Sequence, residues 1–398
     1  MAEGSIRLRS SWIWLLGLFT FGSFIETVFY GQLTAFTPLY LPKLGIRIQD
    51  IALWTGLISS FSGLLGLPFL PFWGALADRY ARKPIIIRSF IVELAAGIVS
   101  LLAGNIWIFI LGRAITSLSL GNSGLMMTTL AERAPANRQG LAFSIMNSAS
   151  PIGAFLGPLV GGPVVDHFGF PTLMAIDAGL LLTVVLALTF GYKDYFVGTN
   201  RGSLLRMALD SIKIILRSQR IRALFVAMFA LYAGWILALT YVPIAVGTLY
   251  QGPDPGTAVG LVLGASGVAA LFLGPLIGVL ADRYGHLKIV LIGAAAAVVL
   301  WPIPALVGGL VAFGAAWAVI NGLTAGVFAV TLSVLSSSTT TEIRGRVMSF
   351  AYLPLNVGLV LGPAIGSLVT RSSVFAVFPT AAVLTALGVG LLLIARKK

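Results

Sequence analysis

Twelve long apolar runs dominate this sequence and restrict the folds it can adopt. A helix needs about 20 apolar residues to cross the hydrocarbon core of a bilayer. Runs of about this length occur near residues 12–40, 52–76, 84–105, 107–131, 140–166, 171–192, 222–248, 257–281, 288–308, 310–338, 345–371 and 374–395. Hydrophobic residues form 58% of the chain and charged residues only 10%, a composition that excludes an ordinary soluble domain. We predict an all-α membrane protein with 12 transmembrane helices.

The distribution of basic residues predicts the orientation of these helices. If both termini are cytoplasmic, Lys43, Arg47 and Arg371 fall in outer loops and Arg113 lies within a span, which leaves 22 of the 26 Lys and Arg on the inner side. Because cytoplasmic loops carry the excess of basic residues in membrane proteins, we predict a multi-pass protein of the cell membrane with both termini cytoplasmic. The net charge of +13 is explained in this way, so no nucleic acid partner is expected.

The chain contains two copies of one unit. The sequence Gly-x-Leu-Ala-Asp-Arg-Tyr begins at Gly74 and returns 204 residues later at Gly278. The sequence Gly-x-x-x-Gly-Pro begins at Gly153 and returns 205 residues later at Gly358. These offsets predict two parallel six-helix halves. We place them at residues 1–192 and 222–398.

The connection between the halves, residues 193–221, differs in character from the other loops. Its charged residues Arg206, Asp210, Lys213, Arg217 and Arg220 are spaced by three or four positions, so they share one helical face. We predict a basic amphipathic helix over residues 203–220 that lies on the cytoplasmic membrane surface and tethers the two halves to anionic lipid, with a regulatory role as the alternative.

The repeated loop resembles the signature loop of the major facilitator superfamily of transporters, and the resemblance extends over the whole chain. It implies a transporter rather than an enzyme, with paired loops that control alternating access. The fifth apolar run also carries Gly-x-x-x-Gly-Pro-x-x-Gly-Gly, which resembles the antiporter motif typical of drug/proton exchangers. The gating residues implied by the two motifs are Gly74, Asp78, Arg79, Arg82, Gly278, Asp282, Arg283, Gly153, Gly157, Pro158, Gly161 and Gly162.

Ionisable residues inside the apolar runs are few, and such residues mark functional sites in membrane proteins. Glu26 lies near the middle of the first run, on a polar stripe formed by Ser23, Glu26, Tyr30, Thr34 and Thr37. We predict that Glu26 carries the coupling proton. Arg113, in a Leu-Gly-Arg-Ala sequence that resembles the membrane arginine of the family, is predicted to assist. Glu93 and Asp177 belong to spans that the resemblance makes peripheral, and their participation is left open.

Aromatic and amide residues supply the candidate substrate cavity. On spans that line the cavity in the family, these residues are Tyr30, Thr34, Asn147, Tyr232, Trp235, Trp317, Asn321, Tyr352 and Asn356. They favour a largely apolar, amphipathic or cationic substrate. We therefore predict a monomeric proton-coupled antiporter that exports hydrophobic drugs, with protons, a small molecule and the bilayer as its partners.

Three functions are alternatives to drug export: transport of another solute, ligand sensing and intramembrane catalysis. The same fold can export a defined metabolite, lipid or sugar, or the chain can be a sensor that binds without translocating. An intramembrane enzyme is disfavoured because the spans hold no His, Cys or acids closely spaced in the sequence. No cofactor or metal is predicted, and the proton gradient is the expected source of energy.

Overall fold

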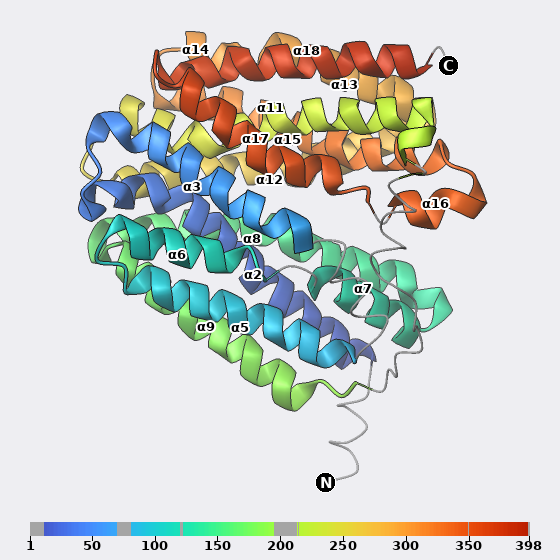
Figure 1. Cartoon of the computed structure of the whole chain (residues 1–398), viewed down its shortest axis with the longest axis horizontal. Coiled ribbons are helices and arrows are strands. Elements are labelled where there is room, and N and C mark those ends of the chain that lie inside the picture. Colours follow the sequence, from blue (N-terminus) through green and yellow to red (C-terminus); the bar gives the residue numbers. More distant parts are fainter. Residues whose placement is uncertain are drawn as a thin grey trace.

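The structure of the protein is a computed structural model that describes residues 12–69, 81–119, 122–194, 213, 215–348 and 350–396. The regular structure within these ranges is helical (Figure 1). The first group of helices comprises α2 (Trp12–Tyr40), α3 (Ile51–Gly66), α5 (Arg82–Leu101), α6 (Ile106–Thr116), α7 (Asn122–Arg133), α8 (Gln139–Phe168) and α9 (Phe170–Gly191). The second group comprises α11 (Gln219–Leu249), α12 (Pro255–Tyr284), α13 (His286–Leu300), α14 (Ile303–Leu306), α15 (Leu310–Ser337), α16 (Thr341–Met348), α17 (Leu353–Val369) and α18 (Val377–Arg396).

The helices have the length and composition of membrane spans. Within the described ranges, ten helical stretches are long and apolar enough to cross a bilayer, and α6 and α17 are shorter apolar helices. The prediction of an all-α membrane protein is confirmed. The boundaries that divide the sequence into two halves and a linker remain a prediction, and most of the predicted amphipathic helix (203–212 and 214) lies outside the described residues.

Within the described residues, three of the twelve apolar runs, the fourth, the ninth and the eleventh, each contain two helices rather than one continuous helix. The fourth run contains α6 and α7. At and after the end of α6, the hydroxyls of Thr116, Ser117 and Ser119 donate to carbonyls three residues earlier. Such bonds compete with the regular helical pattern. The eleventh run is divided into α16 and α17. Pro354 lies in the first turn of α17, where its missing N–H is tolerated and a helix readily begins.

The two groups of helices form the two sides of the molecule (Figure 1). In the first group α2 packs on α8 and α9, and α5 packs on α6 and α9. In the second group α11 packs on α17 and α18, and α12 packs on α15. The groups meet mainly through two helix pairs, α8 with α12 and α3 with α17.

Helices α8 and α12 are in close contact along the first half of α12, as far as Gly267, where an added Cβ atom would lie 3.0 Å from Phe155 Cα. A Cβ atom added to Gly162 would lie 2.5 Å from the carbonyl oxygen of Gly256, so the two backbones touch there. Farther along α12, a Cβ atom on Gly274 would meet no atom within 4 Å, and Phe272 is 75% exposed. We call the end of the molecule that contains Gly162 and Gly256 the closed end, and the opposite end, where α2 begins, the open end.

The pair α3 and α17 also meets through a glycine. A Cβ atom on Gly56 would lie 2.5 Å from the carbonyl oxygen of Pro363. That carbonyl accepts a hydrogen bond of 2.8 Å from the hydroxyl of Tyr241 in α11. Two backbone contacts, one on each side of the molecule, therefore hold the closed end together.

Candidate transport site

The glycines of the predicted antiporter motif lie on two faces of α8. A Cβ atom on Gly153 would lie 2.8 Å from the carbonyl oxygen of Phe24, and one on Gly157 would lie 3.0 Å from that of Val28. These two glycines therefore let α2 approach the backbone of α8 closely. Gly162 instead faces α12. The motif thus packs α8 against α2, which carries Glu26, on one face and against α12 of the second group on another face.

Two further residues of the motif take part in the contacts of α8. Gly161 lies against Phe36 and Gln32 of α2, and the carbonyl of Pro158 lies where a Cβ atom on Gly260 of α12 would be. The buried amide of Gln32 donates to the carbonyl oxygen of Gly157 at 2.8 Å. Sequence analysis did not single out Gln32, although an amide in an apolar run is a recognisable signal.

The polar stripe of α2 is buried at its ends and partly exposed at its centre. Ser23 and Thr37 are buried, whereas Glu26, Tyr30 and Thr34 are half-buried. Polar side chains in the middle of a span gain access to water only through a cavity or a channel in the protein. The centre of the stripe is therefore its most accessible part.

Glu26 lies beside a second carboxyl group. Its side chain is close to Glu93 of α5 and to Asn122 of α7. Glu93 has no exposed surface, and its carboxyl also lies near Ser119. This neighbourhood corrects the peripheral position expected for Glu93. An acid inside an apolar run was visible in the sequence, but its contact with an acid on another helix was not.

Tyr30 connects the acidic pair to Arg113. Its hydroxyl lies 3.0 Å from the carbonyl oxygen of Thr116, to which it donates, and 2.5 Å from the hydroxyl oxygen of Ser119. Arg113, in the last turn of α6, is close enough to Tyr30 to interact with it electrostatically. The arginine is 8% exposed, and its Nε atom has no hydrogen-bond acceptor among the described residues. Arg113 therefore lies inside the helix bundle, near Tyr30, which follows the predicted coupling residue Glu26 by one helical turn.

Aromatic rings of the second group are arranged around Phe328 of α15. Its ring centroid is 4.5 Å from that of Tyr232, 5.9 Å from that of Trp235 and 6.1 Å from that of Tyr352. The indole N–H of Trp235 donates to Asn321 Oδ1 at 2.9 Å. We call Tyr232, Trp235, Phe328 and Tyr352 the aromatic cluster. Tyr352 is 54% exposed, so the cluster has an accessible edge.

The other predicted cavity residues lie in different environments. Trp317 is fully buried and packs against Trp301 and Phe378, with ring centroids 6.3 and 6.4 Å away. It belongs to the internal packing of the second group, so we remove it from the cavity wall. Asn356 is half-buried and donates to the carbonyl of Tyr352 at 2.8 Å, and Asn147 is exposed on α8.

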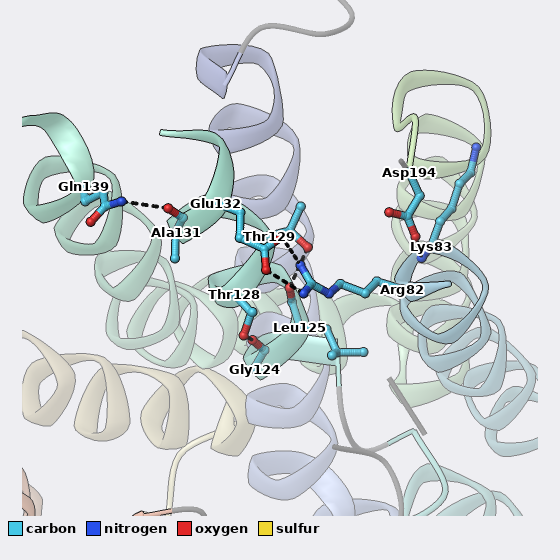
Figure 2. A network of polar contacts seen from close by, with 10 residues as sticks. All are labelled: Arg82, Lys83, Gly124, Leu125, Thr128, Thr129, Ala131, Glu132, Gln139 and Asp194. Atoms are coloured by element: carbon cyan, nitrogen blue, oxygen red, sulfur yellow. Dashed lines mark hydrogen bonds and ion pairs between the residues drawn. The ribbon is translucent and has the colours of Figure 1, made fainter. Parts of the chain in front are cut away.

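The repeated loops are only partly described. Gly74, Asp78 and Arg79 lie outside the described residues. Arg82, at the start of α5, forms an ion pair with Glu132 of α7, which belongs to the same group of helices (Figure 2). The main-chain N–H of Lys83 donates to Asp194 at 2.9 Å. These bonds join α5 to α7 and to the segment that follows α9.

The second copy of the loop makes weaker contacts. Asp282 pairs with His286 at 3.1 Å, and the Asp282 side chain is 78% exposed. The guanidinium carbon of Arg283 lies 5.4 Å from the ring centroid of Tyr284, and a Cβ atom on Gly278 would meet no atom within 4 Å. None of these contacts joins the two groups of helices.

The fold and these sites define a polytopic membrane transporter with two groups of helices that meet at one end. The family model of the Major Facilitator Superfamily matches residues 18–254 and 224–398, and the chain belongs to this family. It is therefore a secondary transporter of small molecules and not an enzyme.

Relatives and solved structures agree with this assignment. The chain is 30% identical to "Multidrug resistance protein MdtG" of Serratia proteamaculans over 370 residues, which are 90% of this chain and 88% of that protein. It is 29% identical to MdtG of Yersinia enterocolitica over 385 residues, 93% of this chain and 90% of that protein.

Two transporters of known structure share the fold. The nucleoside transporter NupG has a TM-score of 0.76 at 16% identity, covering 96% of this chain and 98% of its own. The POT family transporter PepTSo has a TM-score of 0.76 at 14% identity, covering 96% of this chain and 97% of its own.

Proposed function

We propose that the protein is a proton-coupled antiporter that exports hydrophobic or amphipathic drugs, cationic ones included. The observation that supports the proposal is the proximity of half-buried Glu26 to Glu93, whose carboxyl is fully buried and has no hydrogen-bond partner among the described residues. The names of the relatives support drug export, and the glycine motif of α8 supports antiport. As in the sequence analysis, both termini are placed in the cytoplasm, which puts the closed end on the outer side of the membrane.

In this proposal the acidic pair exchanges a proton for the substrate. Two carboxyl groups in contact within a low-dielectric interior do not both carry a charge without a large cost, so the pair holds a proton. Release of that proton leaves a negative charge at Glu26, which a cationic substrate can compensate. Tyr30 positions the hydroxyl network beside the pair, and Arg113 supplies a positive charge in the same group of helices.

The aromatic cluster supplies the apolar part of the substrate site. Aromatic faces attract cations, and the partly exposed rings of Trp235, Phe328 and Tyr352 present these faces to a ligand, with buried Tyr232 behind them. Asn321 fixes the orientation of Trp235, since its own amide N–H donates to the carbonyl of Ser266 at 3.2 Å. Few polar groups lie on this wall, which favours drugs over sugars.

Transport in proteoliposomes tests the proposal. Glu26→Gln removes the titratable proton and keeps the size of the side chain, so the variant should lose uphill accumulation of a lipophilic cation such as ethidium under a pH gradient. Binding and downhill exchange of ethidium should persist. Asp177→Asn is the matched control, because Asp177 is also a buried acid in a span (2% exposed).

Two results would contradict the proposal. Full pH-driven accumulation by Glu26→Gln would remove Glu26 from the coupling mechanism. Binding of ethidium by the unmodified protein without any counterflow would indicate a sensor rather than a transporter.

A further inference from the structure

Asp166 connects the two groups of helices at the closed end. It lies in the last turn of α8, one turn after Gly162. Its carboxylate accepts hydrogen bonds from the main-chain N–H of Gly256 at 2.8 Å and from the N–H and hydroxyl of Thr257, both at 2.7 Å. These two residues form the first turn of α12. A carboxylate from one group thus caps a helix of the other group.

Helix α12 has no cap of its own. The first N–H groups of a helix have no partner within the helix and need an acceptor, and the N-terminus also attracts negative charge. Asp254, at the usual capping position of α12, makes no side-chain capping bond. The acceptor therefore comes from α8, and separation of the two helices would leave the first turn of α12 uncapped.

The capping geometry depends on the close backbone contact. A Cβ atom on Gly256 would lie 2.7 Å from Asp166 Oδ1. The glycines at positions 162 and 256 let the first turn of α12 come within reach of the short aspartate side chain. The carboxylate and the glycine contact therefore form one structural unit.

The equivalent position in the second copy of the repeat has the opposite charge. The offset of 205 residues that relates Gly153 to Gly358 relates Asp166 to Arg371. Arg371 is exposed, and a guanidinium cannot accept a hydrogen bond. Helix α3 would be the counterpart of α12. Its N-cap residue Asp50 makes no side-chain capping bond and pairs instead with Arg47 at 2.7 Å. At the closed end, the N-terminus of α12 is therefore capped by a side chain of the other group of helices, and the N-terminus of α3 is not.

We propose that Asp166 is a gating residue that stabilises the conformation with the closed end shut. Opening this end moves α12 away from α8 and breaks all three hydrogen bonds at once. The proposal requires that the transporter alternates between two conformations, which is part of the proposed function. It is independent of the drug and of the proton.

Distances between spin labels on the full-length protein in lipid nanodiscs test the proposal. The closed end is measured with Ile48→Cys and Gln251→Cys, and the open end with Asn137→Cys and Glu342→Cys. All four residues are exposed, and the chain has no other cysteine. In the conformation with the closed end opened, the closed-end distance is long and the open-end distance is short. Asp166→Ala should raise the population of this conformation about fivefold, a typical effect for the loss of a helix cap.

Graded variants separate gating from folding. Asp166→Asn keeps one acceptor without the charge and should fall between the parent and Asp166→Ala, and Thr257→Val should give a smaller shift. Arg371→Ala, at the equivalent position of the repeat, should leave both distances unchanged.

Unchanged distance distributions in Asp166→Ala would overturn the proposal. If that variant does not fold, unchanged distributions in both Asp166→Asn and Thr257→Val would overturn it. A protein that neither transports ethidium nor couples to protons, but shows the graded shift, would refute the proposed function and leave the gating role of Asp166 intact.

Discussion

Arg82 and Glu132 form a two-pronged ion pair in which Nη1 and Nη2 of the arginine each lie 2.7 Å from a different carboxylate oxygen (Figure 2). The pair joins the first turn of α5 to the last turn of α7. The Arg82 side chain is 6% exposed, whereas that of Glu132 is 52% exposed. The buried guanidinium thus obtains its neutralising charge from a carboxylate that is still partly in water.

Removal of this carboxylate should destabilise the first group of helices. Glu132→Gln leaves the buried guanidinium of Arg82 without its two-pronged acceptor. We expect a loss of about 1 to 2 kcal/mol, below the range for a fully buried pair because Glu132 is half in water. The thermal midpoint in detergent measures the effect. Glu342→Gln, which changes an exposed acid, should leave it unchanged, and equal midpoints for both variants would contradict the prediction.

The stabilising effect of Glu132 should depend on pH. The hydrogen bonds from Arg82 hold the pKa of the Glu132 carboxyl below its ordinary range. The contribution is therefore complete above the ordinary glutamate pKa of about 4.3, and it decreases as the pH falls through the lower pKa of the folded protein. The difference in thermal midpoint between the unmodified protein and Glu132→Gln should be constant near neutral pH and shrink below about pH 4.

The orientation of the chain can be measured with single cysteines. Gln219 begins α11 and Gln251 follows it, and both are exposed. If the closed end is on the outer side, an impermeant maleimide added to intact cells should label Gln251→Cys and not Gln219→Cys. The cysteine-free parent provides the background. Labelling of Gln219→Cys alone would reverse the proposed topology.

The exposed edge of the aromatic cluster should contribute to substrate affinity. Tyr352→Ala removes a ring that a lipophilic cation can contact, and we expect the Kd for ethidium to rise about tenfold. Tyr284→Ala is the control, since Tyr284 is exposed to a similar extent, 51% against 54% for Tyr352, but lies at the end of α12. Fluorescence titration measures both. Equal effects of the two substitutions would exclude a specific role for the cluster.

The closed end should not tolerate a side chain at its glycine contacts. Gly260→Val would place a Cβ atom against the carbonyl of Pro158, whereas Gly274→Val has open space around it. We expect Gly260→Val to prevent closure and abolish transport while the protein still inserts in the membrane, and Gly274→Val to remain active. Transport by Gly260→Val at the parent rate would show that α8 and α12 do not need to touch.

The helical membrane fold can be predicted from the sequence because whether a segment enters the bilayer depends mainly on its own length and on its content of apolar residues. The interruptions of the fourth and eleventh runs lie beside single polar or Pro positions, namely Thr116 and Ser117 at the end of α6 and Pro354 in the first turn of α17. Mean hydropathy over a window does not register such positions. Length and apolarity therefore predicted the spans but not where they break.

The residues of the candidate site could be predicted only where they lie on one face of a single helix. The stripe that contains Glu26 and Tyr30 follows from helical periodicity. The proximity of Glu26 to Glu93 and the capping of α12 by Asp166 each involve two helices that are far apart in the sequence, and helical periodicity within one run gives no signal for such pairs. The expected place of Trp317 on the wall was wrong because periodicity does not distinguish a cavity face from a packed face.

The glycine contact between α8 and α12 also bears on how the surrounding lipid acts on the transporter. The helices touch backbone to backbone at the closed end, whereas a Cβ atom on Gly274, farther along α12, would meet no atom within 4 Å. We therefore expect the protein to occupy a smaller cross-sectional area in the leaflet of the closed end than in the other leaflet. Reversal of the conformation exchanges these areas. The lateral pressure profile and the spontaneous curvature of each leaflet then do mechanical work on the transition, and a bilayer of asymmetric composition favours one orientation of the site even when no substrate is present.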